Sequence, residues 1–221
     1  MADSDVKKRL DVPRLCEEVR RFAKTESAYP EPAIYGVTDG KAVGTYFEHK
    51  FQAYLQTKYT YERGCSAKGI DFPELGVDMK VTSVRQPQSS CPYKDARQKI
   101  FGLGYSLLLF VYEKTDDPAT KTGCLNILHT IFIEAQQTAD YQTTTGILRI
   151  LNNNGNRDDL VAFMAERMLL VEEIQAGEIA DEILRNPPVV GYLTISNALQ
   201  WRLQYARVIE EAGHVAGIHR L

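Results

Sequence analysis

Two aspartates and a lysine in the stretch from Gly69 to Ser83 have the chemistry of a metal-dependent hydrolytic site. Asp71 and Asp78 lie on either side of a short turn-forming segment, and Lys80 follows the second aspartate closely. Carboxylate oxygens are hard ligands that suit Mg²⁺, and a neighbouring lysine can orient water or neutralise negative charge. One interpretation of this stretch is therefore a metal ion held by both aspartates, with the lysine directed at the same point.

A hairpin would bring these three side chains onto one face. Residues 73–76, Pro-Glu-Leu-Gly, have the length and composition of a hairpin loop between two apolar runs. In an antiparallel pairing Phe72 faces Val77, and the two aspartates face each other with Cβ atoms roughly 5 Å apart. Because side chains alternate along a strand, the aspartates and the lysine share one face. The core face then carries Ile70, Val77, Met79 and Val81.

The tripeptide Asp-x-Lys alone has little specificity. It occurs on many ordinary strands as part of a solvated edge with no chemical role. The second aspartate on the same face and the apolar opposite face favour the functional interpretation. Like charges that face each other across two strands destabilise the pairing, and a cation between them would relieve that repulsion.

A helix predicted over residues 42–58 supplies a third acid. Its core face is formed by residues that recur every four positions: Val43, Phe47, Phe51 and Leu55. Glu48 lies on the flank of that face, and the pattern is compatible both with a surface position and with a position beside the hairpin. A helix packed on the sheet would bring Glu48 close to Asp71.

The composition is that of an ordinary globular protein. The chain has 221 residues, of which 44% are hydrophobic, and this is enough to bury one core or a core with an appended subdomain. The formal net charge of −3 argues against a protein that coats nucleic acid non-specifically. It does not exclude a nuclease with a locally basic cleft.

Cysteine usage and hydropathy predict a soluble, cytoplasmic protein. No Cys-x-x-Cys pair occurs, and reduced thiols are expected at Cys16, Cys65, Cys91 and Cys124. The first residues are acidic, unlike a signal peptide, and the longest apolar run, 107–112, is far too short to span a membrane. The chain contains no Walker loop, zinc-ligand spacing or Gly-x-Ser-x-Gly motif, so no nucleotide cofactor is expected.

The remaining pattern predicts an α/β core followed by helices. A first helix begins near Pro13, another covers 94–103, and apolar strands are expected over 105–113 and 124–134. Further helices are expected over 138–151, 157–170, 174–185 and 194–212. We therefore expect two regions. Residues 1–136 would form the catalytic core, and residues 137–221 a helical region that packs on it and binds DNA or forms a dimer.

Two polar segments could read DNA. A predicted loop over 84–93 carries Arg85, Gln86, Gln88, Ser89 and Ser90. The last predicted helix carries Gln200, Arg202, Gln204 and Arg207. Glutamine can bind adenine and arginine can bind guanine with two hydrogen bonds each, and serine can reach bases or phosphates. The alternatives are a plain surface loop, and a helix that only packs on the core or forms a dimer interface.

The set Glu48, Asp71, Asp78 and Lys80, on a helix and two strands, resembles the active site of the PD-(D/E)XK nuclease superfamily. The proline that begins that signature is absent, because Ile70 precedes the first aspartate, but this proline is not a metal ligand. The resemblance implies a restriction-endonuclease-like α/β fold, in which helices flank a mixed central sheet.

A second resemblance lies downstream. Gln98 and Tyr105 are similar to a Gln-plus-Tyr motif in some branches of the superfamily, which makes Gln98 a further candidate for DNA contact. The core resemblance covers about residues 42–134. The size of the chain, its expected helical C-terminal region and its Gln/Ser segment look most like a type II restriction endonuclease.

The resemblance also implies a mechanism with Mg²⁺ as cofactor. Asp71, Asp78 and the main-chain carbonyl of Met79 would bind the metal together with the scissile phosphate. Lys80 would orient or deprotonate the attacking water and help to neutralise the transition state. Glu48 would bind a second metal or hold a water molecule in the outer shell.

The implied function is sequence-specific hydrolysis of double-stranded DNA that leaves 5′-phosphate ends. A palindromic site would require a homodimer in which each subunit cuts one strand. The first alternative is a structure-specific or repair nuclease of the same superfamily, and the second is a DNA-binding module without catalysis. The Gln/Ser segment favours site-specific cleavage over the first, and the intact Asp, Asp and Lys set argues against the second.

Overall fold

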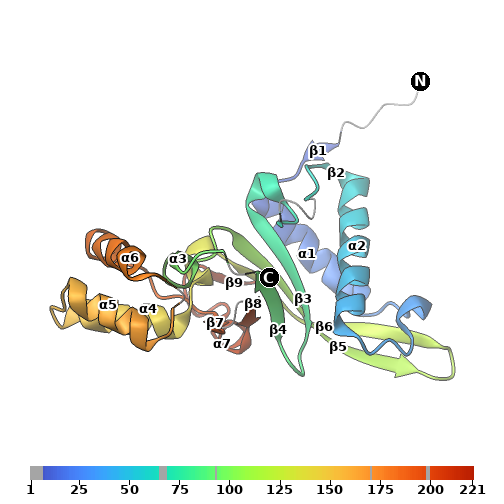
Figure 1. The fold of residues 1–221 in the computed structure, drawn as a ribbon. Coiled ribbons are helices and arrows are strands. Elements are labelled where there is room, and N and C mark those ends of the chain that lie inside the picture. The colour runs from blue at the N-terminus through green and yellow to red at the C-terminus, as the bar shows by residue number, and fades with distance from the viewer. Residues whose placement is uncertain (1–6, 65–68, 93, 170, 198–199) are drawn as a thin grey trace. The chain divides into compact units, whose positions relative to one another are not determined.

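The structure is a computed structural model that describes residues 7–64, 69–92, 94–169, 171–197 and 200–221 (Figure 1). Its internal contacts divide the chain into two compact units. The first contains the chain up to Pro87 together with residues 107–132 and 219–221. The second contains residues 88–106 and 133–218.

Two helices and a four-stranded sheet make up most of the first unit. The helices are α1 (Val12–Glu26) and α2 (Gly40–Lys58), and the strand order in the sheet is β3 (Val77–Ser83), β5 (Ser106–Asp117), β6 (Thr122–Ile133) and β9 (Ile218–Arg220). The chain turns over residues 118–121, and a turn this short makes β5 and β6 antiparallel. Two further short strands, β1 (Lys8–Arg9) and β2 (Tyr59–Thr60), pair in parallel. Single-turn helices cover Pro32–Ile34 and Pro73–Leu75.

The helix starts follow capping rules. Asp11 precedes α1 and its side chain accepts a hydrogen bond from the amide of Arg14, with Pro13 in the first turn as predicted. Asp39 caps α2 in the same way through the amides of Lys41 and Ala42. These caps satisfy amides that have no partner within the helix.

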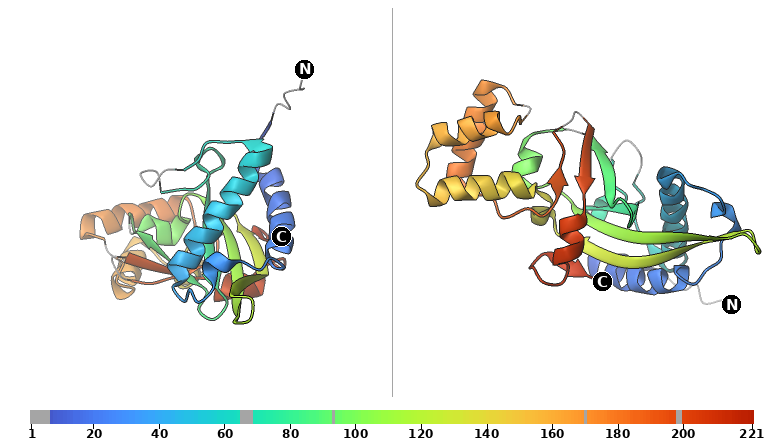
Figure 2. Two further views of the ribbon diagram at one scale, coloured as in Figure 1. Left: turned by 90° about the vertical axis from the view of Figure 1, so that its right-hand side faces the viewer. Right: turned by 90° about the horizontal axis from the view of Figure 1, so that it is seen from below.

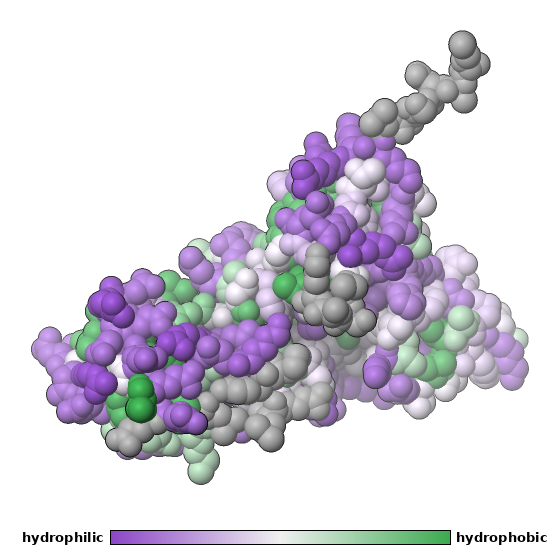
Figure 3. All heavy atoms as spheres, turned by 45° about the horizontal axis from the view of Figure 1, so that its top comes forward, coloured by the Kyte–Doolittle hydropathy of each residue, from purple (hydrophilic) through white to green (hydrophobic). Residues whose placement is uncertain are grey.

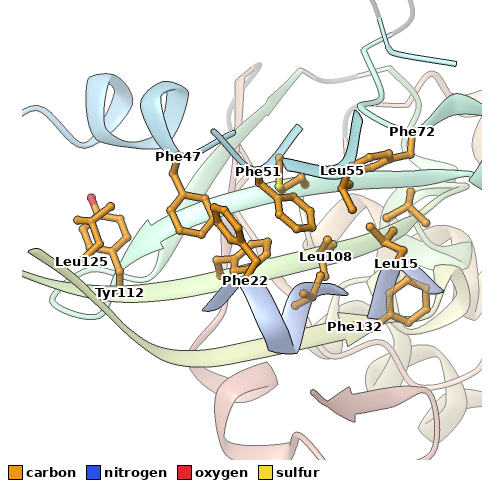
Figure 4. Packing of buried hydrophobic residues seen from close by; sticks show 14 of the residues in the cluster. Leu15, Phe22, Phe47, Phe51, Leu55, Phe72, Leu108, Tyr112, Leu125 and Phe132 are labelled. Carbon is orange, nitrogen blue, oxygen red and sulfur yellow. The ribbon is translucent and has the colours of Figure 1, made fainter. Parts of the chain in front are cut away.

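The core of the first unit lies between these helices and the sheet. Figure 4 shows Phe47 and Phe51 of α2 directed towards Phe22 of α1, and the ring centroids of Phe22 lie 5.4 Å and 5.0 Å from theirs. The same two rings contact Phe110 of β5. Phe47, Phe51 and Leu55 are fully buried, so the predicted core face of α2 is confirmed.

The predicted hairpin is confirmed at its turn. Phe72 and Val77 exchange two backbone hydrogen bonds, N–O 2.9 Å and 3.2 Å, across the turn that precedes β3. Gly76 ends this turn with φ +61°, a left-handed conformation that glycine adopts without steric cost. Of the predicted core face, Val77 and Met79 are fully buried, whereas Ile70 and Val81 are half-buried.

Helices and a second sheet form the second unit (Figure 2). The helices are α3 (Arg97–Phe101), α4 (Tyr141–Asn152), α5 (Arg157–Glu166), α6 (Glu173–Arg185) and α7 (Ala206–Glu211), with a short 3₁₀ helix over Ala135–Thr138. Buried Ile147, Leu160 and Ile179 join α4, α5 and α6 in one core. The sheet has the order β4 (Gln88–Pro92), β8 (Gln200–Gln204) and β7 (Thr194–Ile195).

The structure corrects two sequence predictions here. The expected helix over 194–212 is wrong: β7, β8 and the short α7 occupy this stretch. Apolar residues at spacings of three and four mimic a helix there, but Trp201, Leu203 and Tyr205 are buried alternately with exposed Arg202 and Gln204, which is the period of a strand. The expected loop over 84–93 contains β4, because its backbone pairs with the distant β8.

The division into regions also differs from the expected one. The contacts group residues 88–106 with the region after residue 133, whereas the sequence suggested one division after residue 136. In the described part of the chain after residue 137, the helices α4 to α6 are followed by β7, β8, the short helix α7 and β9. The overall class, mixed α/β with helices beside the sheets, is confirmed.

The surface seen in Figure 3 is mainly hydrophilic, with small and separate hydrophobic patches. Scattered apolar side chains of this kind are normal on protein surfaces. No helix among the described residues is long and apolar enough to cross a membrane. Cys16, Cys91 and Cys124 are free thiols, and Cys65 lies outside the described residues.

Candidate active site

The first unit brings together three of the predicted catalytic residues directly. Asp71 precedes the hairpin turn, and Asp78 and Lys80 are two residues apart on β3. The carboxyl groups of Asp71 and Asp78 lie close enough for Asp78 to raise the pKa of Asp71, as their predicted cross-strand pairing requires. The Lys80 Nζ lies 2.7 Å from Oδ2 of Asp78. The predicted face of the hairpin therefore exists, and its three groups are in contact.

Asp78 and Lys80 are held at the edge between protein and solvent. The Asp78 carboxylate is 6% exposed and the Lys80 side chain 22% exposed. Met79, between them, is fully buried on the opposite face of the strand. The buried methionine anchors the strand, so the acid and the lysine keep a fixed direction.

The pKa of Asp71 is raised to about 7. Burial is the largest cause, and the hydrogen bond and negative charge of Asp78 add to it, with a smaller contribution from Glu48. The amide of Met79 opposes the shift, since it donates to Oδ2 of Asp71 at 2.9 Å. Two carboxylates this close cannot both be ionised without cost unless a cation lies beside them.

Glu48 is the third acid, delivered by α2. This helix packs on β3. Burial raises the pKa of Glu48, the positive charge of Lys80 lowers it, and the negative charge of Asp78 raises it, so the net shift is upward. These charges act on Glu48 because it lies near both groups. Of the two positions compatible with the sequence, the structure therefore places Glu48 beside the hairpin.

Gln52 is a member of this cluster that the sequence interpretation missed. It lies one helical turn after Glu48 on α2 and is only 7% exposed. Its Nε2 is 3.5 Å from Oδ1 of Asp71, while its Oε1 accepts a hydrogen bond from Arg63 at 2.6 Å. The Tyr61 hydroxyl donates to its main-chain carbonyl at 3.1 Å. The signal in the sequence was a glutamine four residues after a candidate acid, because such residues share one helix face.

The carboxylates at this site suit a Mg²⁺ ion whose remaining coordination positions are taken by water and substrate. Among the described residues, no group of three or more His, Cys, Asp or Glu side chains is arranged to hold a metal ion alone. Mg²⁺ typically takes one or two carboxylates and completes its octahedral shell with water and substrate phosphates. The Asp71–Asp78 pair, whose repulsion Lys80 relieves only from the side of Asp78, fits that requirement.

The proposed DNA-contact residues are spread over both units. Arg85 and Gln86 are exposed on the turn that follows β3 in the first unit. Gln88, Ser89 and Ser90 lie on β4, and Arg202 and Gln204 lie on β8, which pairs with it. Gln200 is also on β8, but its side chain lies outside the described part of the chain.

Two further candidates take part in contacts within the second unit. Gln98 donates from Nε2 to the carbonyl of Leu103 at 3.0 Å, a contact that ties α3 to the chain after it. Arg207 of α7 stacks its guanidinium on the ring of Tyr141 at 3.6 Å from the centroid. Tyr105, which accompanies Gln98 in the second resemblance, lies 3.7 Å from the buried thiol of Cys91.

Comparison with known proteins gives a family match over nearly the whole chain. The family described as type II restriction enzyme NspV matches residues 9–220. A protein described as type II restriction enzyme NspV, from Nostoc sp. (strain ATCC 29411 / PCC 7524), is 64% identical over 209 residues. The aligned region covers 95% of this chain and 95% of that protein. No solved structure matches.

Proposed function

The chain belongs to the family of type II restriction enzyme NspV, a family of site-specific deoxyribonucleases, and we propose that it cuts both strands of DNA by Mg²⁺-dependent phosphodiester hydrolysis at the cluster around Asp71 and Asp78. The observation that carries the proposal is the contact between these two carboxylates, with Lys80 2.7 Å from the second. We further propose that the first unit has a restriction-endonuclease-like core of the PD-(D/E)XK type, with 5′-phosphate ends on the products.

Each side chain has a distinct role in this mechanism. Asp71 and Asp78, with the main-chain carbonyl of Met79, would hold Mg²⁺. When bound there, Mg²⁺ would supply the positive charge that polarises the scissile phosphate and makes water more acidic. Lys80, held in place by Asp78, orients the attacking water and offsets the charge that builds up on the phosphate. Glu48 holds a water molecule, or a second cation, on the side of α2.

The raised pKa values agree with these roles. Burial raises the pKa of Asp71 most and the negative charge of Asp78 adds to it, and a cation beside the two carboxylates would oppose both effects by favouring their ionised forms. Glu48 is partly buried and has a raised pKa, which suits an outer position where it accepts or returns a proton.

The test is incubation of the purified protein with phage and plasmid DNA, with and without Mg²⁺, beside Lys80→Ala. The wild-type protein should give a discrete fragment ladder that depends on Mg²⁺, and end-sequencing should locate one short target. Lys80→Ala should cut at least about 10²-fold more slowly, the scale for loss of one acid–base or electrostatic group. Normal cutting by Lys80→Ala would remove the lysine from the mechanism.

Asp78→Asn provides the metal control. It keeps the shape of the side chain but removes a charged ligand, so Mg²⁺ should raise the thermal unfolding midpoint of the wild type and leave that of the variant unchanged. A variant that retains both this Mg²⁺ effect and the normal rate would show that the metal binds elsewhere.

A further inference from the structure

The sheet of the second unit carries two rows of polar side chains on one face. Gln88 of β4 lies opposite Gln204 of β8, which in turn lies opposite Thr194 of β7. Ser90 of β4 lies opposite Arg202 in the next row. Figure 2 shows β4 and β8, separated by about half of the colour scale, running side by side in the right-hand view.

The opposite face of this sheet is buried and apolar. Trp201 is 2% exposed and pairs with Cys91, while Leu203 is fully buried and pairs with Ser89. The hydroxyl of Ser89 makes a hydrogen bond to Tyr205, which is also fully buried. Because side chains alternate along a strand, these anchors direct the side chains of the two polar rows outward. Ser89 therefore belongs to the inner face and leaves the set of proposed DNA-contact residues.

Arg202 is held at the centre of the outer face. Its Nη1 donates to Oγ of Ser90 at 3.1 Å, and its main-chain amide donates to Oγ of Ser196 at 2.8 Å. The amide of Ser196 returns a hydrogen bond to the carbonyl of Arg202 at 3.2 Å. The side chains of Arg202, Gln204 and Ser90 are exposed. One guanidinium nitrogen is thus fixed by the neighbouring strand, and the planar donor group is presented to solvent.

We propose that this outer face reads base edges in the major groove of the DNA target, with Arg202 directed at a guanine and Gln204 with Gln88 directed at adenine. The proposal rests on the function proposed above. The major groove, about 12 Å wide, admits a two-stranded β-ribbon, whose strands lie about 4.8 Å apart. A guanidinium matches O6 and N7 of guanine, and a glutamine amide matches N6 and N7 of adenine.

The chemistry of the face favours base readout over general phosphate binding. Within residues 88–90, 194–196 and 202–204 it offers amides, hydroxyls and one guanidinium, and it has no lysine. Phosphate contacts position a protein on DNA but carry no sequence information, whereas amides and an oriented arginine distinguish base pairs. A strand-borne array is also more rigid than the loop or lone helix expected from sequence.

The experiment is a 7-deazapurine scan of the target that end-sequencing defines. Each purine of a duplex is replaced in turn, which removes only the N7 acceptor in the major groove. Binding without Mg²⁺ is measured by fluorescence anisotropy for the wild type, Arg202→Ala, Arg202→Lys and Gln204→Ala. Arg185→Ala, an exposed arginine on α6, is the matched control.

For the wild type, 7-deazaguanine at one position should weaken binding by roughly 5- to 150-fold, the range for one bidentate base contact. Arg202→Ala should bind the unmodified target equally weakly and should not respond to that replacement. Arg202→Lys keeps the charge but loses the planar donor pair, so it should retain binding to a duplex without the site and lose the preference. Gln204→Ala should likewise bind the unmodified target more weakly, and its binding should not respond to 7-deazaadenine at one position.

If each replacement weakens binding by Arg202→Ala and Gln204→Ala as much as it weakens binding by the wild type, the inference is overturned, even though the wild type cuts at a defined site. A wild-type protein that leaves all DNA uncut in Mg²⁺ would instead overturn the proposed function, and this inference with it. Circular dichroism of each variant checks folding. If Arg202→Ala unfolds, Arg202→Lys and Gln204→Ala still decide the result.

Discussion

The proposed catalytic side chains differ in how the protein holds them. Asp78 is paired with Lys80, and Asp71 is fixed by the amide of Met79 on one oxygen. The other oxygen of Asp71 faces the side-chain amide of Gln52. Arg63 donates a hydrogen bond to the oxygen of that same amide and so fixes its orientation. The orientation of the first aspartate therefore depends on a residue that we do not expect to touch the substrate.

We expect Gln52→Met to lower the single-turnover cleavage rate about 10-fold, less than the loss of a catalytic group. Methionine keeps the volume but removes the amide, so Asp71 loses a partner that limits its rotation. The defect should shrink as the Mg²⁺ concentration rises, because bound metal orients the carboxylate instead. Gln56→Met, one turn further along α2, is the control and should cut normally. An equal loss at all Mg²⁺ concentrations would contradict a positioning role.

At the scale of elements, α2 serves two surfaces at once. Phe47 and Phe51 pack into the core against α1 and β5, while Glu48 and Gln52 of the same turns lie beside the site on β3. Any shift of α2 in the core would therefore move the acid and the amide. The junction between α1 and the end of α2 limits such a shift.

That junction is built on Glu18 of α1, whose side chain is 1% exposed. Its carboxylate accepts hydrogen bonds from Tyr54 at 2.5 Å, Lys58 at 2.7 Å and Tyr59 at 3.0 Å. Burial alone would raise the pKa of Glu18, but the hydrogen bonds from these three groups outweigh burial and lower it. A carboxyl whose pKa is lower in the folded state stabilises the protein most when it is ionised.

Glu18→Gln should lower the free energy of unfolding at pH 7 by about 2 kcal/mol, the scale for hydrogen bonds to a charged group, because Glu18 is buried while Lys58 is partly exposed. The stabilisation by Glu18 is fully present above its unfolded pKa near 4.5 and is lost as the pH falls through the lower folded value. Urea unfolding at pH 7 and pH 3.5 should therefore give a smaller difference between variant and wild type at the lower pH. Glu17→Gln, at the exposed neighbouring residue, should change the free energy of unfolding little at either pH. A difference that does not depend on pH would contradict this account.

At the scale of the whole molecule, the described residues of one chain form a cluster of candidate catalytic side chains around Asp71 and Asp78. A double-strand cut at a palindromic site needs two such clusters related by a two-fold axis, so we propose a homodimer. Each protomer would then present one polar sheet face to one half of the target.

Light scattering should give a mass of two chains for the protein, or for its complex with a duplex that carries the target. Lys80→Ala should give the same mass, because the change is confined to the cleavage cluster. A single chain both with and without DNA would contradict the dimer and would require sequential cuts by one site.

The local pattern of the sequence was enough to identify the core of the candidate site. Asp71, Asp78 and Lys80 fall on one face because the turn between the aspartates is short and side chains alternate with period two. Both constraints act between near neighbours in the chain, and in this stretch no distant contact overrides them. The core face of α2 followed from its periodicity for the same reason.

Only the tertiary structure decided what distant segments do. The stretch after Thr194 has apolar spacings that fit a helix, but its backbone pairs with β4, so that Ser90 and Arg202, 112 residues apart, share a hydrogen bond. The contact of Gln52 with Asp71 likewise depends on how α2 packs on β3. Strand pairing satisfies backbone hydrogen bonds with partners that local periodicity does not specify, and for this reason the polar sheet face was visible only in the folded chain.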